Sequence, residues 1–118
     1  MTVEERIKIE KAIVATLVES AIAKGYKLSV CDGEAWPLKG STSVADVMGA
    51  LFSTDEEVIA IRIDRELVGY VNLIYGNDGY DVISDHTDTE EMRSIIDAAT
   101  LLGNEIEADP EAWLAKVA

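Results

Sequence analysis

The chain has little of several residue types that commonly carry chemistry or fix structure. Its 118 residues include one cysteine, one histidine and two prolines. Cys31 alone can form neither an internal disulfide nor a zinc cluster, so the sequence predicts a fold held together by its hydrophobic core. The single histidine gives little scope for metal or proton-transfer chemistry, and we expect no cofactor.

Long apolar runs are also absent, and basic residues are few. No stretch is long enough to span a bilayer and no leader pattern precedes the first amphipathic segment, so we expect a cytoplasmic protein. Ten basic residues stand against 23 acidic ones, which gives a net charge of −13. A field of that sign repels phosphate. The composition therefore argues against direct binding to nucleic acid or to an anionic membrane.

The excess of acidic residues is concentrated toward the C-terminus. Residues 1–27 carry a net charge of +1, residues 28–76 carry −5, and residues 77–118 carry −9. Such a field attracts basic proteins, but an acidic surface also keeps a protein dispersed in solution. Both interpretations of the charge stay open at this point.

The first segment is typical of a long buried helix in a single domain of residues 1–118. Thr2 and Glu5 form a capping box, and Gly25 suits the end of a helix that runs to about Lys24. Its apolar positions cover more than half of the helix circumference. This helix therefore needs neighbours on two sides, either the sheet and another helix or a second subunit. The apolar positions are Ile7, Ile9, Ile13, Val14, Leu17, Val18, Ala21 and Ile22.

The next segments favour two short strands and a short helix. Asp32-Gly33 predicts a tight hairpin turn within residues 27–40, and Pro37 confines the second arm to a sheet edge or a bulge. Ser43 and Asp46 then form a capping-box-like pair, which predicts a helix of about three turns.

After residue 57 the hydrophobic period changes from helical to two, which predicts antiparallel strands joined by short turns. We expect strands at residues 58–63, 67–75 and 80–84. A final long helix follows, capped either by Thr87 with Glu90 or by Asp88 with Glu91. Pro110 then begins a terminal turn whose Trp113 and Leu114 pack on the core.

This order, α-β-β-α-β-β-β-α, predicts an α+β domain with an antiparallel sheet of about five strands and helices mainly on one face. Because side chains alternate along a strand, one face of the sheet is covered and the other is open. The covered set is Ile59, Ile61, Ile63, Leu67, Val71 and Leu73, and the open set is Arg62, Val68, Tyr70, Asn72, Ile74 and Asp81.

Catalytic and metal-binding interpretations of the acidic stretch 75–91 meet physical objections. Its spacing does not fit an EF-hand loop, although a looser surface calcium site remains an alternative. Neighbouring residues at a strand end point in different directions, so His86 is expected to be a loop residue rather than a base. A Cys31 nucleophile with His86 and Asp85 lacks any cationic group that would lower the thiol pKa.

Two other site classes fail for similar reasons. Residues 40–43 lack the lysine of a glycine-rich phosphate loop. Acidic pairs such as Glu56 and Glu57 are too common in this chain to mark a glycosidase-like pair, and we expect them to lie in a solvated turn. The sequence therefore predicts no catalytic or metal-ligating residue. Local folding does not explain why tyrosines gather beside carboxylates, and this cluster is the predicted binding surface. Its members are Tyr70, Asn72, Tyr75, Asp78, Tyr80, Asp81, Asp85 and His86.

Three strings, CDGEAW, FSTDEE and LIYGNDGYDVISD, resemble a family of small acidic proteins from bacteria and their phages and plasmids. The resemblance covers about residues 28–106, and YGNDGYDVISD is its most specific part. The family more often has an aromatic residue at the place of His86. It has no assigned activity, so the resemblance implies only a mobile-element context.

The leading expectation is a non-enzymatic binding protein that associates with a protein partner, for which a basic protein is one candidate, either directly or after self-association through the first helix or the open sheet face. A sharper form is an inhibitor whose carboxylates stand in for the phosphates of nucleic acid. One alternative is a small-ligand or enzymatic domain with its site at an oligomer interface, and another is a purely structural homo-oligomer such as a homodimer.

Overall fold

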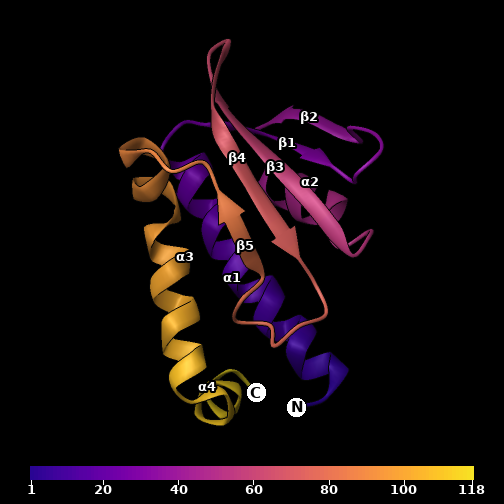
Figure 1. Ribbon diagram of the computed structural model, residues 1–118, viewed down its shortest axis with the longest axis vertical. Coiled ribbons are helices and arrows are strands. Elements are labelled where there is room, and N and C mark those ends of the chain that lie inside the picture. The colour runs from indigo at the N-terminus through magenta and orange to yellow at the C-terminus, as the bar shows by residue number, and fades with distance from the viewer.

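The computed structural model, which describes residues 1–118, contains four helices and a five-stranded antiparallel sheet (Figure 1). This confirms the predicted α+β class. The segment that was expected to be a terminal turn is a short fourth helix. The elements are α1 (Val3–Ala23), β1 (Lys27–Cys31), β2 (Leu38–Ser41), α2 (Val44–Ala50), β3 (Glu56–Ile63), β4 (Glu66–Ile74), β5 (Ile83–His86), α3 (Glu90–Ala108) and α4 (Pro110–Val117).

Helix α1 is the centre of the hydrophobic core. Its capping box forms as predicted, since Glu5 N donates to Thr2 Oγ1 at 3.1 Å and Thr2 N donates to Glu5 Oε1 at 2.8 Å. The helix ends at Ala23, and Gly25 follows the cap residue Lys24 with a φ of +93°, which only glycine adopts easily. Sheet residues and α3 both pack against α1 in one core cluster, so the first of the two predicted environments is the one found.

The sheet has the strand order β2-β1-β3-β4-β5, with every neighbouring pair antiparallel. Ile59, Ile61, Val71 and Leu73 are buried against the helices, which confirms most of the predicted covered face. Ile63 and Leu67 do not join them and are 37% and 41% exposed. They lie at the ends of β3 and β4, beyond a register shift that separates Ile61 from Arg62.

The opposite side of the sheet carries no helix, and we call it the open face. In Figure 1, α1 and α2 lie behind the strands, so this side is turned toward the viewer. Residues paired in register share a side of the sheet. The open face therefore includes three rows that cross the sheet: Lys27 with Arg62, Ser29 with Ala60 and Tyr70, and Cys31 with Val58 and Asn72.

Both edges of the sheet are short strands of four residues, β2 and β5. Pro37 precedes β2, as expected of an edge strand. The connection from β1 is not a tight turn but the loop 32–37, because the Asp32 carboxylate holds a wider turn. It accepts hydrogen bonds from Glu34 N at 3.0 Å and Ala35 N at 2.9 Å.

The expected strand at 80–84 is displaced, because residues 76–82 first follow α1. Gly79 lies so close to α1 that a Cβ there would be 3.1 Å from Ile9 Cγ2 and 3.2 Å from Arg6 O. The chain pairs with β4 only from Ile83 onward. Tyr80 and Asp81 are thus in a turn, and His86 ends β5 instead of lying in a loop.

The start of α3 also differs from expectation. Thr89, rather than Thr87 or Asp88, is its cap and accepts a hydrogen bond from Met92 N at 3.1 Å. Thr87 instead accepts from Tyr70 N at 3.0 Å, which ties the segment before the helix to β4. None of the four helices combines the length and apolar character needed to cross a bilayer.

Gly69 of β4 has no room for a side chain. A Cβ at this position would lie 2.8 Å from Met92 Cγ and 2.9 Å from Thr87 Cβ. We expect Gly69→Ala to lower the free energy of unfolding by about 1–3 kcal/mol, measured by urea denaturation. The control is Gly49→Ala in α2, where nothing lies within 4 Å. Gly49→Ala should raise the free energy of unfolding by about 0.5–1 kcal/mol. Equal stabilities of the two variants would contradict this packing.

Candidate functional site

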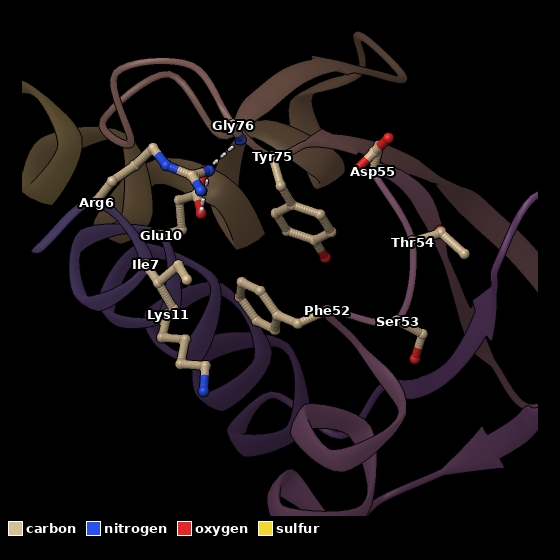
Figure 2. A pocket seen from close by; sticks show the side chains of 10 residues that line it. All are labelled: Arg6, Ile7, Glu10, Lys11, Phe52, Ser53, Thr54, Asp55, Tyr75 and Gly76. Carbon is tan, nitrogen blue, oxygen red and sulfur yellow. Dashed lines mark hydrogen bonds and ion pairs between the residues drawn. The ribbon is translucent and has the colours of Figure 1, made fainter. Parts of the chain in front are cut away.

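A recess of about 400 Å³ lies where α1, the loop between α2 and β3, and the end of β4 meet (Figure 2). Figure 2 shows the rings of Phe52 and Tyr75 stacked inside it, with centroids 4.5 Å apart. Around them stand charged side chains from α1 and polar side chains from the loop. The full lining is Arg6, Ile7, Glu10, Lys11, Phe52, Ser53, Thr54, Asp55, Tyr75 and Gly76.

Glu57, behind the recess, is a carboxylate buried to 1% exposure. It accepts hydrogen bonds from Phe52 N at 2.6 Å and Ser53 N at 3.0 Å. Phe52 has a φ of 64°, in the left-handed region. Two successive N–H groups in such a turn form a concavity that binds anions, and the chain fills it with its own carboxylate. Because Glu57 binds the N–H groups that follow α2, the helix ends after seven residues, which is two turns instead of the expected three.

Tyr75 donates the third hydrogen bond to Glu57, with Oη 2.6 Å from Oε1. Burial raises the pKa of Tyr75 well above its ordinary range, and the bond to the Glu57 carboxylate raises it further. The phenol therefore stays protonated throughout the physiological range and acts as a donor rather than a base.

Glu10, at 1% exposure, is the second buried carboxylate. It forms an ion pair with Arg6 on the preceding helical turn at 3.2 Å and accepts from Gly76 N at 2.9 Å. Both interactions appear in Figure 2. Since Gly76 belongs to the segment that follows β4, Glu10 fastens that segment to α1.

The groups left free at the rim are fewer than the lining suggests. Ser53 Oγ donates to Ala50 O at 3.1 Å, and Thr54 Oγ1 lies 2.8 Å from Glu56 O. Lys11 Nζ lies 5.6 Å from the centroid of the Phe52 ring, a cation–π contact. The buried acids Glu10 and Glu57 thus hold the backbone around the recess, and Asp55 and the cation–π-bonded Lys11 are the charged lining side chains without an ion pair.

The residues of the predicted binding surface do not form one site. Tyr75 lines the recess of Figure 2. Its hydroxyl donates to the buried carboxylate of Glu57. Tyr70 and Asn72 lie on the open face, and Asp85 is paired with Asn72 in the ladder. Tyr70 is 41% exposed.

The other members lie in the turn between β4 and β5 and in the edge strand β5 itself. Tyr80 Oη lies 3.2 Å from Asp78 Oδ2, and Asp81 is exposed in the same turn. Tyr80, Asp85 and His86 line a hollow of about 310 Å³ between β5 and α3. His86 Nδ1 lies 3.0 Å from Thr87 O.

Two chemistries weighed from the sequence have no geometric basis. Cys31 on β1 and His86 on β5 are separated by β3 and β4, a distance of about 14 Å across the sheet. No three His, Cys, Asp or Glu side chains are arranged to hold a metal ion.

Glu10 and Glu57 were not identified from the sequence, and Glu57 was wrongly assigned to a solvated turn. Periodicity does carry a signal for both. Glu10 precedes Ile13 and Val14 by three and four residues, which puts it on the buried side of α1. Glu57 precedes Ile59 by two residues, which puts it on the covered face of β3.

No protein-family model, curated protein or solved structure matches the chain.

Removal of the Tyr75 hydroxyl tests the bracing role of Glu57. We expect Tyr75→Phe to lower the free energy of unfolding by about 1.5–3 kcal/mol, because a buried carboxylate loses one of three donors. Tyr70→Phe is the matched control, since Tyr70 is exposed and should change stability by less than about 0.5 kcal/mol. Urea denaturation measures both. Equal losses in the two variants would contradict the role.

The pH dependence of this difference follows from the raised pKa of Tyr75. Below the ordinary tyrosine pKa of about 10 the phenol is neutral in both states, so the stability gap between wild type and Tyr75→Phe is constant. Above it, only the unfolded chain loses the proton. The gap should then close by up to about 1.4 kcal/mol per pH unit. A gap independent of pH up to 11.5 would show that the folded state does not hold the Tyr75 phenol protonated.

Proposed function

We propose that the protein is a small acidic binding domain that associates with a basic protein partner through the segment after β4. The observation that supports this is the separation of charge on the surface. Residues 77–118, which we call the acidic segment, contain eleven acidic and two basic residues. All eleven are exposed: Asp78, Asp81, Asp85, Asp88, Glu90, Glu91, Asp97, Glu105, Glu107, Asp109 and Glu111.

The two bases of the acidic segment neutralise little of it. Arg93 forms an ion pair with Asp88, and Lys116 forms one with Glu105 at 3.8 Å. The other nine carboxylates have no ion pair within the chain. Carboxylates that repel one another in this way are free to attract cations of a partner.

The charge density on α3 favours a basic protein in general over a close copy of a nucleic acid strand. The five acidic residues of α3 are spread over 19 residues, roughly 28 Å of helix. That spacing is about 6 Å per charge, whereas one DNA strand carries a phosphate every 3.4 Å or so. The sharper form of the proposal is an inhibitor whose carboxylates take the place of phosphates on a phage-related or plasmid-related protein. Because the charges of α3 alone are too widely spaced, such an inhibitor would also have to use the carboxylates on the β5 side.

The open face offers contacts that charge alone cannot give. Asp85 and Asn72 are ladder partners, so the acidic segment is continuous with the open face. Tyr70 lies next along β4 on the same side, and a half-exposed tyrosine is a common anchor at the centre of protein interfaces. We expect the partner to cover this corner of the molecule.

Two variants of equal net charge test whether the position of the acids matters. The first replaces Asp78, Asp81 and Asp85 by Asn. The second, a control, replaces Glu19, Glu34 and Glu66, which are exposed elsewhere, by Gln. Partners captured from a host lysate are purified, and their affinities are measured by calorimetry. At 0.2–1 kcal/mol per exposed charge pair, the first variant should bind roughly three- to a hundredfold more weakly.

The control variant should keep wild-type affinity within about threefold. Binding should also weaken steeply between about 0.05 M and 0.5 M salt, because exposed charges are screened. Equal losses in the two variants would reduce the acidic segment to a source of net charge. Affinity unchanged by salt would overturn the proposal.

A further inference from the structure

The open face carries a depression of about 480 Å³ at the end of the sheet away from β5. Its floor is made by Ser29 and Ala60, which are paired in register and have small side chains. Three cationic side chains, Lys27, Lys39 and Arg62, and the indole of Trp36 surround that floor. We call this set the basic depression.

The three cations gather without partners in a chain that has more than twice as many acids as bases. The protein makes three ion pairs, and none of them includes Lys27, Lys39 or Arg62. Lys27 and Arg62 are direct ladder neighbours on β1 and β3. Like charges in that position destabilise a sheet, so the basic depression has a cost that a bound anion would remove.

The walls of the basic depression are held in place. Ser29 Oγ accepts a hydrogen bond from Gly40 N at 2.9 Å, which fixes β2 beside the floor. Trp36 follows the turn that the Asp32 carboxylate holds through Glu34 N and Ala35 N. Trp36 remains 40% exposed, so part of its ring is available for stacking.

We propose that the basic depression binds a free nucleotide, with its phosphates on the three cations and its base on Trp36. The volume lies within the range of small-ligand pockets, about 300–1,000 Å³. Several cations around one point suit a multiply charged phosphate group, and an exposed indole stacks on any nucleobase. The site differs in kind from the glycine-rich phosphate loop that the sequence lacks.

A small anion fits better than a polyanion or a second copy of this chain. Both of the latter must approach along a surface whose net charge is −13. A free nucleotide is small enough to contact the three cations directly, and exposed charges beyond a Debye length of about 8 Å are largely screened. One carboxylate, Asp64, lines the rim, and it can accept a hydrogen bond from a ribose hydroxyl or a base amine.

Calorimetric titration of the 118-residue protein with ADP tests the proposal. Pyrophosphate and adenosine, which are parts of ADP, are titrated separately for comparison. We expect saturable binding of ADP at millimolar concentration or below and at least tenfold weaker binding of each part. Lys27→Gln and Arg62→Gln should each weaken ADP binding about tenfold, the equivalent of one charge-assisted hydrogen bond. Trp36→Leu should bring the affinity for ADP down to that for pyrophosphate.

Matched controls are Lys8→Gln and Arg65→Gln, both exposed and outside the basic depression. Each should leave ADP affinity within about twofold of wild type. A second measurement needs no ligand. Because Arg62→Gln relieves the repulsion between Lys27 and Arg62, it should raise the Tm of the ligand-free protein by about 1–4 °C, whereas Arg65→Gln should not. No saturable ADP binding, or equal affinities for ADP and pyrophosphate, would overturn the proposal. Tighter binding of an oligothymidylate than of ADP would replace it with single-stranded nucleic acid.

Discussion

Glu57 holds a negative charge at 1% exposure, and much of one end of the molecule depends on how that charge is satisfied. Without partners a buried carboxylate is unstable by several kcal/mol. Here three donors converge on it, two from the loop after α2 and one from Tyr75, just after β4. The same carboxylate therefore stops a helix, holds Phe52 in a left-handed conformation and orients Tyr75. Glu10 does the equivalent for the segment that follows β4.

The elements defined by strong periodicity could be predicted from the sequence, and those defined by tertiary contacts could not. Thr2, Gly25 and Pro110 mark helix ends through local chemistry, so those ends were located correctly. The start of β5 depends on Gly79 against Ile9, a contact between residues 70 positions apart in the chain. Thr87 was expected to cap α3, but its hydroxyl bonds to β4 instead.

The candidate sites show the same limit. Hydrophobic periodicity places Glu10 and Glu57 at core positions, but only the folded chain shows that their partners are Gly76 N and Tyr75. The basic depression is less accessible still to sequence reasoning. Lys27, Lys39 and Arg62 lie on three strands and become neighbours only through the register of the sheet. Net charge, which averages over the chain, conceals such a local reversal of sign.

The two short edge strands have a consequence for the protein at high concentration. An exposed sheet edge can pair with the edge of another molecule and so begin aggregation. Here each edge offers only four residues. Pro37 lies immediately before β2, and the exposed carboxylates of Asp85 and Asp88 lie in and just beyond β5. Growth of intermolecular sheets is thus opposed at one edge by a missing donor and at the other by like charge, and concentrated solutions should stay clear.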